Sequence, residues 1–584
     1  MVASMINLTI DGVKVEVEEG STILQACNKA NIKVPTLCFL KEINEIGACR
    51  MCLVEVEGIK NLVTSCVYPA SEGMVVHTNT QRVRKSRKCT LELLLSDHNQ
   101  DCLSCARSLN CELQALAREY DCDANFYKGE KSKSIIDNSS ECFIRDNSKC
   151  IKCQRCVAVC SARQSVNVIG VNKRGFNSYV GCSYDNPIGN STCVNCGQCV
   201  INCPTGALKD KSQKPQVLQE LSGKTKRLVV AMAPSVRVSL GEGLGGQIGE
   251  NVEGKIVTAL RKLGFDDVFD IDFAADLTIM EEGTEFINRL NSNQKGPMFT
   301  SCCPGWVKFV EHFYPEFISN LSTCKSPQQM MGATIKTYYA EKLGIKPEDI
   351  YFVSIMPCIA KKFERIRENQ NAAGVYDVDA VLTTRELAEI IKSFGIDFMN
   401  LEPGEFDKPL GISSGSGVIF GATGGVMEAA LRTLKDTLEN KELEKVDYLL
   451  VRGLSGTKEA TVEVAGKKLN IAVVSGLKNA RTLLEKIKCG EKQYDFVEVM
   501  ACPGGCANGG GMPIHPSYIT NNKQIAGLRA KGLYDSDLKN KTRKSHKNPA
   551  IVDIYKNYFG APGGEKAHKL LHTTYVDRSK KKKL

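Results

Sequence analysis

Alternating hydrophobic and polar positions predict a β-hairpin at the start of the chain. Residues 6–17 alternate in this way on either side of the turn-forming pair Asp11-Gly12. Residues 21–30 then have the pattern of a helix, with Ser21 as its N-cap. A hairpin followed by a helix is therefore expected at the N-terminus.

The hydrophobic pattern changes at Arg227. From there short apolar runs alternate with longer amphipathic segments, which is typical of α/β organisation. The predicted strands are 228–233, 351–356, 448–451, 471–474 and 496–500. Turns just past the ends of such strands contain Cys302, Cys303, Cys358, Cys502 and Cys506. Ligands bind at the carboxyl ends of strands in open α/β sheets, so four thiolates from three loops could meet on one metal cluster.

The cysteine content changes this picture most. The chain has 584 residues, enough for several domains, and 27 of them are cysteines. Residues 1–8 lack the pattern of a secretory signal peptide, so metal ligation is favoured over disulfides. No apolar run is long enough to span a bilayer. A cytoplasmic protein without a membrane segment is therefore expected.

The net charge of +10 lies partly in two basic runs, 82–88 and 580–583. A basic face is compatible with nucleic acid, with steering of an acidic protein partner, or with plain solvated charges. One tryptophan and the lack of a basic patch interleaved with aromatic residues disfavour nucleic acid. No nucleic-acid partner is expected.

Two groups of metal-ligand type precede residue 112. The first surrounds the predicted strand Leu53–Val56 and consists of Cys38, Cys49, Cys52 and Cys66. Four thiolates suit a 2Fe–2S cluster, with zinc as the alternative. The second follows the basic, helix-compatible stretch 82–96 and consists of His98, Cys102, Cys105 and Cys111. One imidazole with three thiolates suits structural zinc, or a 4Fe–4S cluster whose neutral ligand raises its reduction potential.

An internal repeat follows the polar, linker-like stretch 121–141. The pattern C-x2-C-x2-C-x3-C occurs twice, as in bacterial two-cluster ferredoxins, where the fourth cysteine of each run ligates the other cluster. One predicted 4Fe–4S set is Cys150, Cys153, Cys156 and Cys203, and the other is Cys160, Cys193, Cys196 and Cys199. The two runs must then fold against each other. Together the N-terminal groups and the repeat predict four iron–sulfur centres in series.

Three motifs in the second half resemble the signatures of iron-only hydrogenases. They are TSCCPGW (300–306), MPC-x2-KK-x-E (356–364) and MAC-x3-C-x-NGGGMP (500–513). The likeness extends through 232–237, 275–282 and 420–432 and covers essentially the whole chain, with the layout of the clostridial monomeric enzymes. The two N-terminal groups are similar to those that this family shares with the largest peripheral subunit of respiratory complex I.

The resemblance implies a multidomain α+β and α/β protein with five parts. In chain order these are a β-grasp 2Fe–2S ferredoxin-like domain (1–81), a His/Cys3 4Fe–4S domain (82–126), a two-4Fe–4S ferredoxin-like domain (127–215), a two-lobed α/β catalytic domain (216–520), and a C-terminal small-subunit-like segment wrapping the catalytic domain (521–584).

The resemblance also implies an H-cluster and its ligands. Its 4Fe–4S part is expected on Cys303, Cys358, Cys502 and Cys506, with Cys506 bridging to a diiron subsite that bears carbon monoxide, cyanide and a bridging azadithiolate. Lys361 is expected to hydrogen-bond a cyanide. The implied pocket residues are Pro234, Ser235, Gln328, Met356, Gly417, Phe420 and Met500. Without side chains, Gly417 and Gly421 would let the backbone approach the cofactor.

A proton path is implied as well. Cys302 is expected to be a proton shuttle instead of a ligand, since a free thiol has a pKa of about 8.5, within reach of neutral pH. Glu282 and Glu285 lie three residues apart and share one face of a helix, a spacing that alone would suggest only a solvated face. The implied order is Cys302, Glu282, Ser322, Glu285 and then solvent, together with Arg289.

The implied activity is the reversible formation of H2 with reduced ferredoxin as electron donor, after maturation proteins install the diiron subsite. The sequence leaves open whether the chain works alone or beside a flavin subunit that uses NADH. Rival interpretations are an electron-transfer subunit of a complex-I-like assembly and an iron–sulfur assembly or hydrogen-sensing relative; Cys302 and Glu282 favour catalysis. The glycines at 415, 417 and 421 are one position off the dinucleotide-binding pattern, so no NAD site is expected.

The sequence departs from the family pattern, or gives no role, at several positions. Pro503 stands where some clostridial members carry histidine, and Cys324, two residues past Ser322, has no predicted role. Small buried hydrophobes are the expectation for the other unassigned cysteines, Cys27, Cys89, Cys122, Cys142, Cys182 and Cys489.

Overall fold

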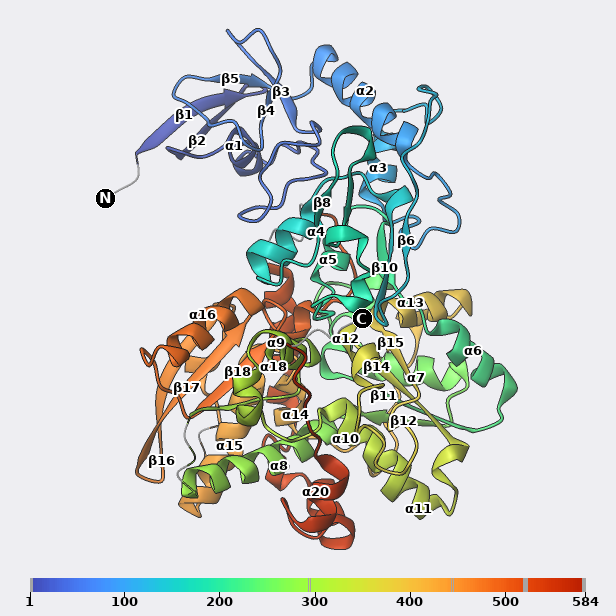
Figure 1. Cartoon of the computed structure of the whole chain (residues 1–584), viewed down its shortest axis with the longest axis vertical. Helices are drawn as coiled ribbons and strands as arrows, with labels where there is room; N and C mark the ends of the chain where they lie inside the picture. Colours follow the sequence, from blue (N-terminus) through green and yellow to red (C-terminus); the bar gives the residue numbers. More distant parts are fainter. Residues whose placement is uncertain are drawn as a thin grey trace.

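The predicted N-terminal hairpin is present and belongs to a five-stranded sheet. In a computed structural model that describes residues 4–292, 294, 296–442, 444, 446–517 and 524–579, β1 (Met5–Ile10) pairs antiparallel with β2 (Val13–Glu18). The strand order is β2-β1-β5-β3-β4, with β3 (Leu53–Val56), β4 (Val63–Thr64) and β5 (Val75–His77). This unit is at the top of Figure 1.

The N-terminal helix α1 (Ile23–Lys29) begins one residue later than expected. Its N-cap is Thr22, not Ser21, because the Thr22 hydroxyl accepts the Gln25 N–H and the Gln25 side chain accepts the Thr22 N–H. The helix buries Ile23, Leu24, Ala26 and Cys27 against the sheet. A mixed sheet covered by one helix is therefore the N-terminal fold.

The basic stretch forms the predicted helix α2 (Gln81–Asp97), which ends at His98. It packs on α3 (Glu112–Glu119) through Leu91, Leu95, Leu113 and Leu116. Residues 121–141 are largely irregular, apart from the short β6 (Ile136–Asp137).

The repeat region folds as two related halves. Helix α4 (Arg155–Ala158) begins after Gln154, and α5 (Gln198–Ile201) begins after Gly197; both preceding residues have left-handed backbone, at φ +63° and +72°. Gln154 and Gly197 each lie between the second and third cysteines of their run. The same turn therefore brings the thiols of each run together. The accompanying strands are β7 (Phe143–Asp146), β8 (Gly170–Asn172), β9 (Tyr179–Gly181) and β10 (Leu208–Asp210).

Two four-stranded sheets form the two lobes of the lower part of Figure 1. The first is parallel, ordered β12 (Asp267–Asp270), β11 (Arg227–Met232), β14 (Ile350–Met356) and β15 (Ala380–Thr383). The second is ordered β13 (Met298–Phe299), β18 (Phe496–Met500), β17 (Lys467–Ser475) and β16 (Thr457–Val464), with only the β16–β17 pair antiparallel. Their parallel strands are buried and read as nearly continuous apolar runs.

The predicted strand at 448–451 is wrong. It is a single 3-10 turn, Leu449–Val451, whose Leu449 and Leu450 are 72% and 71% exposed. An apolar run of four residues cannot by itself distinguish a buried strand from an exposed turn.

Helices cover the sheets and fill the space between the lobes (Figure 1). The parallel sheet carries α6 (Lys214–Gly223), α7 (Glu253–Leu263) and α13 (Thr384–Ser393). The second sheet carries α15 (Gly425–Glu439) and α16 (Leu477–Lys488). Between the lobes are α8 (Ile271–Asn291), α9 (Pro304–Phe313), α10 (Pro327–Thr334) and α14 (Gly415–Ile419).

The C-terminal segment lies against both the interlobe helices and the loops of the catalytic half. It contains α18 (Gln524–Lys539), α19 (Pro549–Ile554) and α20 (Glu565–Leu571). Asp537 of α18 pairs with Arg432 of α15, and both side chains are fully buried. None of the described helices is long and apolar enough to cross a membrane. The basic run 580–583 lies outside the described residues.

Replacing Asp537 with alanine is expected to lower the free energy of unfolding of the catalytic half by about 3–5 kcal/mol, because it removes a fully buried carboxylate that Arg432 and Arg543 share and leaves Arg432 to pair with Glu428. Denaturation is followed by the fluorescence of Trp306, the sole tryptophan, which is fully buried here. The matched control is Asp535→Ala, which removes an exposed pair with Lys531 and should cost no more than about 1 kcal/mol. Equal midpoints for both variants would contradict the prediction.

Candidate active site and electron path

Three loops at the carboxyl ends of strands meet around one cavity. They follow β13, β14 and β18, and α9 begins directly after Cys303. The five thiols that the sequence places at strand ends all line this cavity, namely Cys302, Cys303, Cys358, Cys502 and Cys506. All 27 cysteines of the chain lie in its described part and carry free thiols.

The residues predicted to line the pocket are brought together with one exception. Those on the cavity wall are Pro234, Ser235, Gln328, Met356, Phe420 and Met500. Gly417 is not on the wall: a Cβ there would lie 2.5 Å from the Asp272 carbonyl oxygen, so this glycine lets α14 pack closely on α8. Gly421 does line the cavity, where a Cβ would collide with the Ser235 hydroxyl.

The cavity suits a positively charged metal cluster. Burial, followed by repulsion from Cys303, raises the pKa of the Cys358 thiol to about 12. Several thiolates can stay ionised at such a site only when bound to cations, and a set of four thiolates is what an iron–sulfur cluster takes. The Ala501 N–H donates to Cys303 Sγ at 3.4 Å. Gln328 Oε1 is buried with no hydrogen-bond partner among the described residues, which leaves it available to a bound group.

A polar network that the sequence did not reveal supports one wall. The Lys361 ammonium donates to both Glu364 oxygens, at 3.0 and 2.9 Å, and to the Cys302 carbonyl oxygen at 3.0 Å. Burial disfavours the charge, but Glu364 outweighs burial and raises the pKa of Lys361. Glu364 also accepts from Ser326 and Gln328. Glu364 belongs to the motif at 356–364, but the spacing of that motif did not predict which residues Glu364 would hydrogen-bond.

The four residues of the predicted proton path lie near one another. Glu282 and Glu285 share a face of α8, and Ser322 Oγ donates to Glu285 Oε2 at 2.7 Å. Burial, then repulsion from Glu285, raises the pKa of Glu282 to about 8, opposed by hydrogen bonding from Ser322. Burial and nearby Glu282 raise the pKa of Cys302 well above its ordinary value. Both groups are therefore protonated at neutral pH.

Arg289 lies one turn further along α8. Its guanidinium donates to the carbonyl oxygens of Ser319 and Pro297, at 3.4 and 3.5 Å. It is half-buried, next to Glu285 at the outer end of the path.

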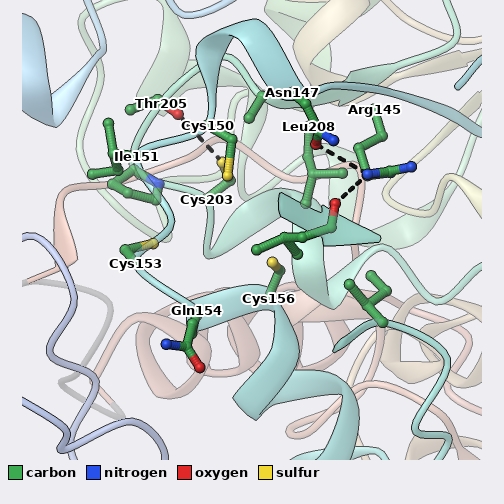
Figure 2. A pocket seen from close by; sticks show the side chains of 14 residues that line it. Arg145, Asn147, Cys150, Ile151, Cys153, Gln154, Cys156, Cys203, Thr205 and Leu208 are labelled. Carbon is green, nitrogen blue, oxygen red and sulfur yellow. Dashed lines mark hydrogen bonds between the residues drawn. The ribbon is translucent and has the colours of Figure 1, made fainter. Parts of the chain in front are cut away.

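The ferredoxin-like halves present two cysteine-lined cavities. The first is lined by the predicted set Cys150, Cys153, Cys156 and Cys203 (Figure 2). The second is lined by the predicted set Cys160, Cys193, Cys196 and Cys199. In each cavity the fourth thiol of one run joins three thiols of the other run, as the spacing predicts.

The thiols of the first N-terminal group are also brought together. Cys52 Sγ lies 3.2 Å from Cys66 Sγ, and a hydrogen bond from the Cys38 thiol lowers the pKa of Cys49.

The His98 imidazole is buried. Burial and then Lys149 lower its pKa to about 4, so the ring is neutral, and Nδ1 has no hydrogen-bond partner in the described part of the chain. A neutral ring with a free nitrogen fits a metal ligand.

The sequence predicted centres in one series, but the two N-terminal groups both adjoin the first ferredoxin-like cavity, so their arrangement is branched. The Asn44 side-chain amide donates to the carbonyl oxygens of Cys38 and Cys153, at 2.8 and 3.1 Å. Cys111 Sγ lies 3.7 Å from the Pro204 carbonyl oxygen, next to Cys203. Both N-terminal groups therefore border the same ferredoxin-like cavity.

The second ferredoxin-like cavity borders the large one. Cys502 Sγ lies 3.9 Å from the Cys196 carbonyl oxygen. From the point where the N-terminal groups join, neighbouring thiol sites thus lead to the cavity between the lobes.

The remaining cysteines are not uniformly buried. Cys27, Cys142 and Cys182 are buried as expected, Cys89 and Cys122 are half-buried, and Cys489 is exposed. Cys324 is buried and its Sγ lies 3.8 Å from Glu285 Oε2.

Comparison with known protein families agrees with this layout. Residues 226–510 match the family described as iron only hydrogenase large subunit, C-terminal domain, and 523–578 match the iron hydrogenase small subunit. The N-terminal half matches a 2Fe-2S iron-sulfur cluster binding domain (3–81), the NADH-ubiquinone oxidoreductase-G iron-sulfur binding region (87–125) and a 4Fe-4S dicluster domain (149–207). These matches favour iron–sulfur clusters over zinc in the N-terminal half.

Individual relatives cover the whole chain. A NADP-reducing hydrogenase subunit of Solidesulfovibrio fructosivorans is 47% identical over 99% of this chain and 100% of its own length. Iron hydrogenase 1 of Clostridium pasteurianum is 44% identical over 98% and 100%. A solved [FeFe]-hydrogenase from Chlamydomonas reinhardtii superposes with a TM-score of 0.55 at 41% identity, over 62% of this chain and 98% of that one.

The raised pKa of Glu282 is testable by infrared spectroscopy. A carboxylic-acid C=O band is expected at pH 7 and should disappear with a midpoint of about 8. It should be absent from Glu282→Gln and should titrate at lower pH in Glu285→Gln, which lacks the repelling charge. A Glu282 that is already ionised at pH 7 would refute the assignment.

Proposed function

The chain belongs to the iron-only hydrogenase family, and from that premise we propose that it catalyses the reversible reduction of two protons to H2 with electrons from reduced ferredoxin. It is a hydrogenase that relays electrons through iron–sulfur clusters. The proposed reaction at an H-cluster rests on the convergence of five thiols in one cavity. Four thiols suffice to bind a 4Fe–4S cluster, which leaves Cys302 unligated beside Glu282.

We assign the H-cluster to the cavity between the lobes. Cys303, Cys358, Cys502 and Cys506 would hold its 4Fe–4S part, and Cys506 would bridge to a diiron subsite with carbon monoxide, cyanide and azadithiolate. When bound, this group supplies the metal centre at which protons and electrons combine. The fixed ammonium of Lys361 suits an anionic ligand such as cyanide, since Glu364 holds it charged and in place.

Protons are proposed to move between this cavity and solvent through side chains of α8. Cys302 exchanges a proton with Glu282, and Ser322 links Glu282 to Glu285, from which the proton reaches solvent past Arg289. The raised pKa of Glu282 supports this order, because a group that exchanges protons works best with a pKa near the operating pH.

Electrons are proposed to follow the thiol sites. One 2Fe–2S and three accessory 4Fe–4S clusters would occupy the N-terminal half, on the ligand sets that line its cavities. The contact between Cys502 and Cys196 supports transfer into the H-cluster. The domain boundaries expected from the resemblance, 1–81, 82–126, 127–215, 216–520 and 521–584, are retained as proposals.

Ferredoxin is the proposed partner, along with maturation proteins for the diiron subsite. The relative from Solidesulfovibrio fructosivorans is named as a subunit that reduces NADP, so operation beside further subunits is the second candidate. The exposed basic side of α2, with Arg84 and Lys85, favours an acidic protein as the direct electron donor.

Glu282→Gln is expected to lower turnover by about 10²–10⁴-fold, because the amide cannot take up and release a proton. The absorption and electron paramagnetic resonance spectra of the clusters should be unchanged. Glu281→Gln is the matched control: it is a buried neighbour on the same helix but bonds Tyr555 and His572 instead of the path. Undiminished turnover in Glu282→Gln would refute the relay.

High salt is expected to raise the KM for ferredoxin, since screening weakens attraction between exposed charges. Lys85→Glu should raise that KM at low salt and flatten its salt dependence. Lys467→Glu, at an equally exposed lysine of the β16–β17 hairpin, is the control and should leave the KM unchanged. Salt-independent kinetics would count against docking by charge.

A further inference from the structure

Three potential metal ligands of different chemistry converge outside the cavity. Glu285, Cys324 and His572 each offer one ligand atom, and these atoms lie within 4.8 Å of one another. They come from α8, from the loop after Ser322, and from the segment after α20. Backbone pairing holds the last two together, since Thr573 N–H donates to the Thr323 carbonyl oxygen at 2.8 Å.

The imidazole of His572 is oriented for ligation. Its Nε2 lies 3.0 Å from Glu281 Oε2, and that carboxylate also accepts from the Tyr555 hydroxyl and the Gly563 N–H. Because Glu281 acts as acceptor, the ring proton belongs on Nε2. Nδ1 then has a lone pair that accepts a hydrogen bond from the Thr323 hydroxyl at 2.7 Å, and a cation on Nδ1 would displace this hydroxyl toward Glu285 Oε1, 3.5 Å from it. A carboxylate behind a histidine ring is the arrangement that orients histidine ligands of zinc.

The spacing of the other two ligands also fits. Cys324 Sγ lies 3.8 Å from Glu285 Oε2. Zinc–sulfur and zinc–oxygen bonds of about 2.3 and 2.0 Å place two such atoms about 3.5 Å apart around a tetrahedral ion. A movement of a few tenths of an ångström therefore brings both within bonding distance. Thiolate, imidazole and carboxylate are the ligand types that Zn²⁺ prefers.

The cluster lies just below the surface. Glu285 is half-buried, whereas the His572 side chain is only 6% exposed and Cys324 is buried. The exposed ring of His568 stacks on His572, with centroids 4.4 Å apart. Glu285 and His568 therefore mark the side from which a cation would reach the site.

We propose that Glu285, Cys324 and His572 form an inhibitory binding site for Zn²⁺. Binding displaces the thiol proton of Cys324 to solvent and occupies the Glu285 carboxylate. Glu285 then no longer exchanges protons with Ser322, so protons cannot pass from solvent to Glu282, and hydrogen evolution stops while the clusters stay intact. The inhibitory part rests on the proton path proposed above, whereas the metal site itself does not.

Two measurements on the maturated, full-length enzyme test the site. The first is zinc retained per chain after gel filtration, measured by elemental analysis. The second is hydrogen evolution against added zinc chloride. The variants are Cys324→Ala and His572→Ala, and Cys489→Ala is the matched control because its thiol is exposed and remote in sequence. Each variant should keep its turnover without zinc.

The unsubstituted enzyme and Cys489→Ala are expected to retain one zinc and to lose turnover reversibly, with recovery on adding a chelator. Cys324→Ala and His572→Ala should need at least about tenfold more zinc for half-inhibition, since losing a ligand costs more than losing a supporting contact. The visible absorption of the clusters should stay constant.

Equal inhibition of all four proteins, or bleaching of the clusters at the same zinc concentration in each, would overturn the inference. Zinc retained by the unsubstituted enzyme and lost from both variants, but without inhibition, would leave the site standing and refute the path through Glu285. Failure of the site is thus distinguishable from failure of the proposed proton path.

Discussion

The dominant constraint on this fold is the cost of gathering ionised sulfur in a buried space. Burial raises the pKa values of the thiols in the cavity between the lobes, and repulsion from neighbouring thiols adds to the pKa values of Cys358, Cys502 and Cys506. Bound iron would remove that cost, because a metal-bound thiolate stays ionised without the penalty of a free buried charge. The two sheets must then present their carboxyl ends to each other, because no single loop contributes enough ligands to the cavity.

Buried ion pairs lie at the junctions between units. Arg155, in the ferredoxin-like region, pairs with Glu112 of α3 at 2.9 Å. Lys362, just past the Cys358 loop, pairs with Glu386 of α13 at 2.7 Å and also donates to the Lys211 carbonyl oxygen of the ferredoxin-like region at 2.7 Å. Each replaces water around a charge with a fixed partner, and breaking one leaves a buried charge alone. The sites are thereby held in a fixed mutual geometry.

Local patterns predicted much of this arrangement. Period-two alternation gave the hairpin β1–β2, apolar runs gave β11, β14 and β18, and cysteine spacing gave the sets around Cys150 and Cys160. The strand wrongly predicted at 448–451 was a local failure, whereas the failures at the candidate site were non-local. The role of Gly417 in packing α14 on α8 depends on a helix far away in the sequence. The partners of Glu364 depend on a loop and helix elsewhere in the chain, and no local spacing encodes such contacts.

The C-terminal segment shows how the two paths are kept apart. Tyr575 donates to the Ser322 carbonyl oxygen at 2.6 Å, and Thr573 pairs with Thr323, so this segment fixes the loop that holds Ser322 against Glu285. The ferredoxin-like region, in contrast, contacts the cavity where Cys196 lies against Cys502. Protons need mobile hydrogen bonds between titratable groups, whereas electrons need only short gaps between rigid metal sites. Because the proposed proton path uses α8 and the C-terminal segment, whereas the thiol sites use cysteine-bearing loops, a side chain of that path would titrate without disturbing the cluster ligands.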